Sequence, residues 1–557
     1  MDVGPDRGAA TSSAKEDATS RQALTLADLP NEVVVAILST LCLCHHCSHD
    51  GTILRGNPAD VYMATQTNLT ALSSVAKTCR AMRLLAQPIL HHGIPTAIYA
   101  ARNGSFRLYQ FVRTIAMRPD LASSVRFLAL DTLVSHLAPC APRTAADILP
   151  NDQETEIIAQ RASELGLCAP EDWGAAMIFD ANDIPQPANT SRLLQVDEPT
   201  AVFVAALAIG LCDKVQVVEF TKIRGICHPY MFHHIIKPLY GKRGLSNIHR
   251  LSIGGEYLDR REHWDDISGL DIRQLDGLAQ HMPQLREVEV RCGFLLDPTP
   301  TARLIHRNTE IPVEFKFPRA AVDLGVLVRL DLILCSATDA GLAELLANCA
   351  NLQVFSYVSM YNGVHIRRRN FGAALLPDGI TNLLTRSVHL HRTLRQLTLE
   401  HYPMNETGAA GAYTSLQALE AVTEVHLGAI GLFSKPQDNP HYYAPAGPGL
   451  PALPQPLGRI LPPNTATLNI FQVGDWKQRA SDAVLKLLEV IRVEGRFRRL
   501  RQIRVWTDQL WPRPHVYGAR PSVERWVPGI ADEAAALGIE FCIDGPADEV
   551  IQRLRLT

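Results

Sequence analysis

Short runs of leucine and β-branched residues recur from about residue 120 to the end of the chain, and this recurrence restricts the possible folds. Each run has the length and composition of a buried strand. Several runs follow an apolar helical segment and a polar turn, as in LDGLAQHMPQLREVEV (275–290) and LAELLANCANLQVFSY (342–357). One strand and one helix cannot bury the inner face of the strand, so neighbouring units must cover one another.

The spacing of these runs is relevant to two possible α/β architectures. The runs are VRFLAL (125–130), VQVVEF (215–220), IHRLSI (248–253), LREVEV (285–290), LVRLDLIL (327–334), LQVFSY (352–357), LRQLTL (394–399), VTEVHL (422–427), ATLNIF (466–471), LRQIRV (500–505) and GIEFCID (538–544). After a long first gap they start roughly 25 to 45 residues apart, more widely than in a standard leucine-rich repeat. We therefore predict an irregular leucine-rich-repeat-like solenoid over residues 105–550. The alternative is a single α/β domain with a parallel sheet.

Two segments of this body do not follow the pattern. Residues 137–198 are rich in Pro, Asp and Ala and predict a long loop insertion with one helix near 152–165. Residues 434–464 contain nine prolines and three glycines, which predicts a second loop insertion with polyproline character. Such loops are tolerated at the edges of a solenoid and can carry recognition.

The amino-terminal quarter has a different, helical pattern. Asp28 stands at an N-cap position, Pro30 suits the first helical turn, and Glu32 is favoured near the positive end of the helix dipole. The apolar residues that follow fall on one helical face, and a second periodic stretch covers about 69–92. We expect a disordered tail over 1–22 and a helical domain over 23–95 with an insertion at 42–68. A domain of this size is marginal alone and needs a partner surface.

The order of residues in these two helical blocks resembles the F-box motif, in the form found in large fungal F-box proteins. The matching positions are Leu29-Pro30-x-Glu32, Ile37-Leu38-x-x-Leu41, Leu72-x-x-Val75-x-Lys77-x-Cys79-Arg80 and Ala86-x-Pro88-Ile89-Leu90-His91-His92. The resemblance covers about the first quarter of the chain. A usual F-box joins its first two helices by a few residues, whereas this chain has the 42–68 insertion.

The resemblance implies the substrate-recognition subunit of an SCF-type E3 ubiquitin ligase. The helices would dock on the Skp-type adaptor and through it on a cullin, and the body would bind an unidentified protein substrate. The implied adaptor-binding residues are Leu29, Pro30, Glu32, Ile37, Leu38, Leu41, Leu72, Val75 and Cys79. The alternatives are a helical hairpin that packs on the body, and a repeat scaffold for protein–protein interaction without a ubiquitin role.

A cluster of zinc-type ligands lies inside the insertion. The segment CLCHHCSHDG places Cys and His residues between Cys42 and His49. A tetrahedral site usually takes two ligand pairs separated by a loop, and no second Cys/His cluster follows before Cys79. We therefore favour a loop without a metal, although a subset of these residues with a remote His could bind one.

The sequence contains no recognisable catalytic motif. It lacks a phosphate-binding G-x-x-x-x-G-K-[ST] loop, an H-E-x-x-H helix and a G-x-S-x-G elbow, so we expect neither catalysis nor a cofactor. Two basic clusters, at 367–369 and at 496–504 beside Trp506 and Trp511, could contact phosphate but are more often solvated.

Composition and charge place few further limits. The net charge of −3 gives no general attraction to nucleic acid or to anionic membranes. We find no secretory signal and no apolar stretch long enough to span a bilayer. With twelve scattered cysteines, these features predict reduced thiols in a cytoplasmic or nuclear protein.

Overall fold

A computed structural model gives a mixed α/β architecture dominated by one long parallel sheet. The described residues are 29–42, 58–95, 104–131, 152–167, 198–223, 235–255, 272–275, 278–291, 294–295, 302–306, 309–313, 324–359, 375–401, 412–433, 455–471, 477–506 and 529–544. The strands are β1 Gly93–Pro95, β2 Phe127–Asp131, β3 Val217–Ile223, β4 Arg250–Gly255, β5 Glu287–Arg291, β6 Phe294–Leu295, β7 Ala302–His306, β8 Thr309–Val313, β9 Arg329–Ala337, β10 Val354–Ser359, β11 Gln396–Glu400, β12 Glu424–Gly428, β13 Thr467–Phe471, β14 Gln502–Trp506 and β15 Glu540–Asp544.

Helical segments alternate with these strands along the chain. They are α1 Asn31–Ser39, α3 Pro58–Thr78, α4 Arg80–Leu90, α5 Gly104–Met117, α6 Pro119–Ala122, α7 Asp152–Glu164, α9 Glu198–Leu211, η6 Lys237–Leu239, α11 Arg243–Ser246, η7 Ile272–Leu275, α12 Leu278–His281, α13 Asp339–Ala347, α14 Pro377–Arg386, α15 Leu390–Thr393, α16 Ala429–Phe433, α17 Leu457–Ile460, α18 Lys477–Glu494 and α19 Ile530–Ala536.

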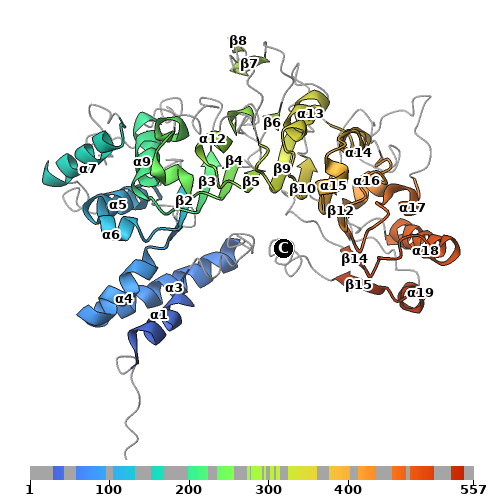
Figure 1. Cartoon of the computed structure of the whole chain (residues 1–557), viewed down its shortest axis with the longest axis horizontal. Helices are drawn as coiled ribbons and strands as arrows, with labels where there is room; N and C mark the ends of the chain where they lie inside the picture. The colour runs from blue at the N-terminus through green and yellow to red at the C-terminus, as the bar shows by residue number, and fades with distance from the viewer. Residues whose placement is uncertain are drawn as a thin grey trace, which may run out of the picture.

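The strands of the large sheet lie side by side in the order in which they occur in the sequence. The order is β1-β2-β3-β4-β5-β9-β10-β11-β12-β13-β14-β15, all parallel, with β6 pairing only with β9. Figure 1 shows the sheet as an arch with most helices along its outer side. The short hairpin β7–β8 forms a separate two-stranded sheet.

Each predicted run from 125–130 to 538–544 forms a strand, so the prediction of an α/β fold with recurring strands is confirmed. The strands begin one or two residues later than the runs. The reason is that the first apolar residue of a run, such as Ile248, Leu285 or Leu352, lies in the turn before the strand and is buried there. This residue anchors the turn in the core, and the two later apolar residues anchor the strand.

A repeated set of backbone hydrogen bonds connects consecutive units. The carbonyl oxygen just before one strand accepts from two successive N–H groups of the next unit; His249 O, for example, accepts from Arg286 N and Glu287 N at 2.8 and 3.0 Å. The carbonyls that accept two such bonds belong to His92, Arg126, Gln216, His249, Arg286, Val328, Gln353, Arg395, Thr423 and Ala466. The units therefore stack in the same way although their sequences and lengths differ.

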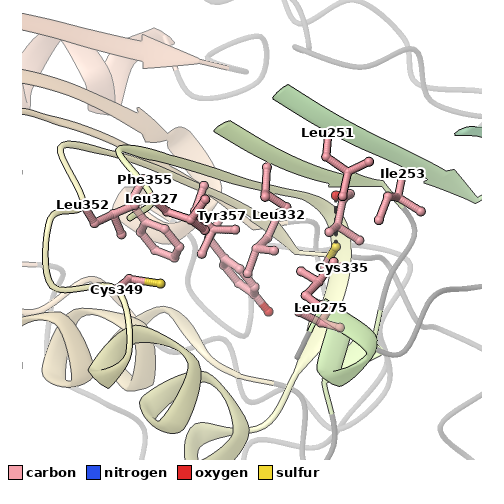
Figure 2. Close-up of a cluster of buried hydrophobic side chains, with 14 of the residues drawn as sticks. Leu251, Ile253, Leu275, Leu327, Leu332, Cys335, Cys349, Leu352, Phe355 and Tyr357 are labelled. Atoms are coloured by element: carbon pink, nitrogen blue, oxygen red, sulfur yellow. Dashed lines mark hydrogen bonds between the residues drawn. The ribbon is translucent and has the colours of Figure 1, made fainter. Parts of the chain in front are cut away.

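The main core lies between the sheet and the helices. In most strands of the large sheet two alternate apolar residues point toward the helices, as Leu251 and Ile253 do in β4. Figure 2 shows these side chains with Phe355 and Tyr357 from β10 and Cys349 from the turn after α13. One continuous core connects the units from α5 to β15.

The amino-terminal helices α1, α3 and α4 form a unit with its own small core. Its buried members include Val34, Leu38, Leu72 and Ile89. In Figure 1 this unit lies beneath the first end of the arch. Helix α3 begins at Pro58, so the second part of the predicted insertion 42–68 is helical. We call α1, α3 and α4 the helical unit.

The predicted loop regions are only partly described. A helix was expected near 152–165, and α7 occupies Asp152–Glu164 as predicted. The end of the 434–464 segment is ordered instead of loop-like, because α17 lies in it and Leu457 and Ile460 are buried. The predicted tail 1–22, residues 43–57, 168–197 and 434–454 lie outside the described residues.

Candidate functional site

The sheet surface that points away from the main core is lined by polar residues. Because side chains alternate along a strand, the residues between the core positions must point to the opposite face. In-register pairing of the strands then aligns them into rows across the sheet; one such row contains Glu219, Ser252, Glu289, Asp331 and Ser356. We call this surface the polar face.

The polar face has two parts with different chemistry. The first, which we call the charged half, lies on β3, β4, β5 and β9 and contains Glu219, Arg250, Ser252, Glu287, Glu289, Arg291, Arg329 and Asp331. The second, the aromatic half, lies on β12–β14 and contains Glu424, His426, Asn469, Phe471, Gln502, Arg504 and Trp506.

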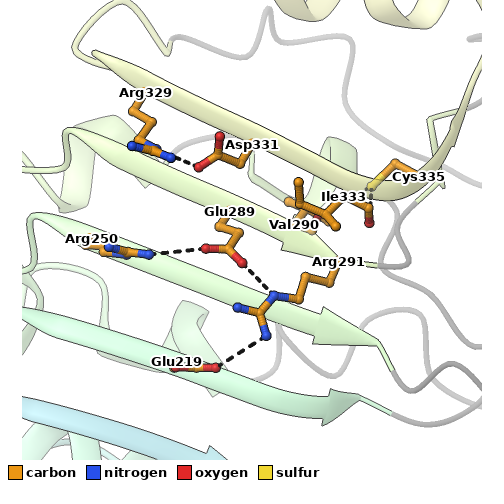
Figure 3. Close-up of polar contacts among 9 residues, drawn as sticks. All are labelled: Glu219, Arg250, Glu289, Val290, Arg291, Arg329, Asp331, Ile333 and Cys335. Atoms are coloured by element: carbon orange, nitrogen blue, oxygen red, sulfur yellow. Dashed lines mark hydrogen bonds and ion pairs between the residues drawn. The ribbon is translucent and has the colours of Figure 1, made fainter. Parts of the chain in front are cut away.

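Side chains of the charged half bind one another across neighbouring strands. Arg250 Nη2 donates to Glu289 Oε2 at 3.2 Å, and its Nη1 lies 3.5 Å from Glu287 Oε2. Arg291 Nε donates to Glu289 Oε1 at 2.5 Å, and its Nη1 lies 3.9 Å from Glu219. Figure 3 shows this chain of contacts running across β3, β4 and β5. Arg250 on β4 thus contacts two carboxylates of β5, and Arg291 on β5 connects Glu289 of its own strand with Glu219 on β3.

Strand β9 carries a further ion pair of the charged half. Arg329 Nε donates to Asp331 Oδ2 at 2.6 Å along the same strand (Figure 3). Burial lowers the pKa of Arg329, but the carboxylates of Asp331, Glu287 and Glu289 together more than compensate, so the pKa is raised overall. The guanidinium therefore stays charged and paired.

The aromatic half is organised by stacked rings. The rings of His426 and Phe471 are parallel with centroids 5.7 Å apart, and Phe471 stacks on Trp506 at 6.2 Å. His426 Nε2 lies 2.8 Å from Glu424 Oε1. The hydrogen bond from His426 lowers the pKa of Glu424, although burial opposes the shift. Glu424 is therefore an anionic acceptor that orients the imidazole.

Several polar atoms of the aromatic half are buried without a partner. They are Nδ1 of His426, Nε of Arg504 and Nε1 of Trp506, none of which hydrogen-bonds to any residue that the structure describes. Buried polar groups almost always have a partner, because an unsatisfied group costs free energy. These atoms therefore mark a place where an added acceptor or donor would stabilise the protein.

The predicted adaptor-binding residues lie together on the helical unit but differ in exposure. Pro30, Glu32, Ile37 and Cys79 are exposed. Leu29, Leu41 and Val75 are half-buried around the small core, whereas Leu38 and Leu72 are fully inside it. Leu38 and Leu72 can therefore contribute to docking only by holding the helices together.

Cys79 also has a local role. Its Sγ accepts from Met82 N at 3.5 Å and caps the amino end of α4. Any docking contact of Cys79 would thus add to a structural function.

The Cys/His cluster falls mostly outside the described residues, which include only Cys42 of the 42–49 segment. Cys42 Sγ lies 3.6 Å from His92 Nδ1 in the small core. Across the described ranges no group of three or more His, Cys, Asp or Glu side chains could hold a metal ion. Of the body cysteines, Cys349 is buried, and burial raises its thiol pKa to about 12, so it is a packing residue.

The basic cluster before β14 does not form a single patch. Arg496 donates to Gly458 O at 2.9 Å and covers the ring of Phe497. Arg498 donates to Gly495 O at 3.2 Å, and Arg504 belongs to the polar face. Residues 367–369 and Trp511 lie outside the described residues.

The polar face was not identified from the sequence, although its signal is present there. The residues between the core positions of the strand motif, such as Arg250 and Ser252 in RLSIGG, are those that form it. Aligning these positions from one strand motif to the next would have shown that charged residues gather on one group of strands and aromatic residues on another.

Comparisons with known proteins give no family for this chain. No protein-family model matches it, and no curated protein shows significant similarity. Among the helices that the structure describes, none is both long and apolar enough to cross a bilayer.

Proposed function

We propose that this chain is a non-catalytic substrate receptor of an SCF-type ubiquitin ligase. The helical unit would dock on the Skp-type adaptor and through it on a cullin, and the body would be a leucine-rich-repeat-like solenoid that binds a protein target. The sequential strand order and the repeated carbonyl contacts support the repeat interpretation of the body.

The observation that carries this proposal is the exposed apolar surface of α1. Val33 and Ile37 are one helical turn apart and are 42% and 41% exposed. They lie beside Pro30 and Glu32, which the F-box resemblance places in the docking surface. Exposed apolar side chains grouped in this way are typical of protein contacts. The separate small core allows the unit to present this surface without involving the sheet.

A single substitution on the full-length chain tests the docking surface. Ile37→Asp should weaken binding to a purified Skp-type adaptor by about tenfold or more, because it places a charge in an apolar contact. The matched control is Val493→Asp on α18, an aliphatic residue that is 75% exposed, and it should bind as the wild type does. Failure of the wild type to bind the adaptor, or full binding by Ile37→Asp, would refute the proposal.

The second candidate is a repeat scaffold without a ubiquitin role, in which the helical unit caps the sheet. The favouring observation is that β1 directly follows α4 and pairs with β2, with Gly93 opposite Phe127. Hydrogen exchange on the full chain separates the candidates. Slower exchange of α1 on addition of the adaptor supports the receptor, and unchanged exchange supports the scaffold.

A further inference from the structure

We propose that residues 551–556 of this chain pair with the outer edge of β15 as an antiparallel strand and so close the large sheet. The surface concerned is the last end of the arch, where β15 and α19 lie in Figure 1. The proposal is carried by an apolar row that becomes exposed at β15 and by a strand motif that follows β15 in the sequence. It does not depend on adaptor docking.

The core-facing row of the sheet changes its exposure at the last strand. Leu427, Ile470, Val505 and Ile543 occupy matching register positions on β12, β13, β14 and β15. The first three are 0% exposed, whereas Ile543 is 45% exposed. Each inner strand is covered by the unit after it, and among the described strands of the large sheet none follows β15. The terminal unit of such a stack needs a cover.

Helix α19 covers this end only from the helix side. It has seven residues, of which Ile530 and Ala534 are buried, and it packs against α18 and β15. Glu533 forms an ion pair with Arg492, which holds α19 to α18. The outer edge of β15 is not covered by this helix, and an apolar edge strand promotes pairing with other chains.

The segment after β15 repeats the strand motif of the body. Residues 551–556 read IQRLRL, which has the spacing of LREVEV (285–290) and LRQIRV (500–505) with Ile in place of the first Leu. Both of those runs form strands of the large sheet. The segment lies outside the described residues, so its sequence and its position next to β15 are the grounds for choosing it as the occupant.

The short connection decides the direction of this strand. Six residues, 545–550, separate the end of β15 at Asp544 from the motif, and they begin with the turn signal Gly545-Pro546. A parallel crossover needs about a dozen residues or more, whereas an antiparallel hairpin needs only a few. The segment can therefore reach β15 only as an antiparallel neighbour. Antiparallel edge strands are common on sheets that are otherwise parallel.

In this direction the apolar side chains meet on the core side. With residue 551 opposite Asp544, Leu554 lies opposite Phe541 and diagonal to Ile543. Phe541 is partly buried against the main core. Leu554 would thus extend the core by one strand and cover the exposed aliphatic surface of Ile543.

The same alignment places the arginines of the segment on the polar face. Arg553 lies opposite Cys542, and Arg555 lies opposite Glu540. The exposed Glu540 carboxylate accepts from Gln502 Nε2 at 2.5 Å and from Cys542 Sγ at 3.2 Å, and both of these donors are uncharged. An arginine directly opposite adds a cross-strand pair of opposite charge. A slip by one residue would turn the arginines toward the core.

A cross-link from the native Cys542 tests the pairing on the full chain. In Arg553→Cys the introduced thiol lies opposite Cys542 on the same face, so mild oxidation should join the two within one molecule. The matched control is Leu554→Cys, which places a thiol one residue further along but on the other face. Mass spectrometry of the linked peptides should find at least about tenfold more of the Cys542 cross-link in Arg553→Cys than in the control.

Equal yields from the two variants, or no link to Cys542 in either, would overturn the proposal. A link between two molecules in Arg553→Cys would overturn it too, because a second copy of the chain would then occupy the edge.

Hydrogen exchange gives a second test without added thiols. Leu554→Asp places a charge in the apolar contact with Phe541, so the amides of β15 should exchange about tenfold faster or more, while those of β3–β5 keep the wild-type rate. Thr557→Asp adds the same charge beyond the motif and should leave β15 unchanged. Equal exchange of β15 in Leu554→Asp and the wild type would show that the segment does not cover this edge.

Discussion

The two halves of the polar face belong to one sheet and share one register, but their polar groups are satisfied in different ways. In the charged half, arginines pair with carboxylates of their own strand or of nearby strands, as Arg250 does with Glu289 on the next strand. Among the described residues of this half, the neutral hydroxyl of Ser252 is buried without a hydrogen bond. In the aromatic half, Arg504 and Trp506 keep unpaired donors.

This difference separates polar groups that are compensated within the chain from polar groups that are not. Paired buried charges are compensated within the chain and gain little from a ligand, since each group already has a partner of opposite charge. They are well suited to fixing which strands lie next to each other, because a shift in register would leave a charge buried alone. Unpaired donors lack this compensation and cost free energy in the folded state. Burial of polar residues alone would not have distinguished the two halves.

The largest effect that we expect comes from exchanging arginines for methionine in the two halves. Arg250→Met removes a guanidinium that is 6% exposed and leaves Glu289 less compensated, so the free energy of unfolding should fall by about 3–5 kcal/mol. Arg504→Met removes a part-exposed charge with an unpaired Nε and should cost less than about 1 kcal/mol. Denaturant unfolding of both variants measures the difference. Equal losses would mean that the halves do not differ in pairing.

A second effect concerns pH and the strand that lies between the two halves. His401 follows β11, is fully buried, and its Nδ1 lies 3.2 Å from the Tyr413 hydroxyl. Burial lowers the pKa of His401 to about 3. The unfolded chain binds this proton below about pH 6.5 and the folded chain does not, so stability should fall as pH drops from about 6.5 to 3.

The His401→Phe variant isolates this contribution. The wild type should lose at most about 1.4 kcal/mol per pH unit from this group in that interval. Urea unfolding at pH 6 and pH 4 should show a smaller decrease for the variant than for the wild type. Parallel decreases in the two proteins would show that His401 does not control acid sensitivity.

The strands could be predicted from the sequence because their signal is local. Runs such as LREVEV carry the apolar alternation and the preceding turn within a few residues, and each formed a strand. The shift of each strand start has a physical cause, because the first apolar residue belongs to the buried turn. The start of α3 at Pro58 was missed because residues 58–68 lack a clear apolar face.

The candidate site was harder to predict because it depends on which strands become neighbours. His426, Phe471 and Trp506 come from successive units and meet only after the sheet has formed. No local pattern reports that Arg250 will find Glu289 while Arg504 keeps an unpaired Nε. The F-box resemblance concerned a separate part of the chain and carried no information about this face.

The smallest effect that we expect tests whether solvent screens Glu424 more than it screens the ion pairs of the charged half. The Glu424 side chain is 35% exposed, and the hydrogen bond from His426 lowers its pKa. A lowered carboxyl pKa stabilises the protein above the unfolded value near 4.3, and this contribution is lost as pH falls through the folded pKa. Because solvent screens the pair, Glu424→Gln should cost only about 0.5 kcal/mol at pH 7.

Salt distinguishes this pair from the ion pairs of the charged half. In about 1 M NaCl the loss caused by Glu424→Gln should become smaller, since salt screens the coulombic part of the interaction of Glu424 with its charged neighbours. The loss caused by Arg250→Met should persist, because Arg250 and Glu289 are shielded from the solvent ions by burial. If salt reduced both losses equally, the two sets of charges would be screened alike, and the contrast between the halves would not hold.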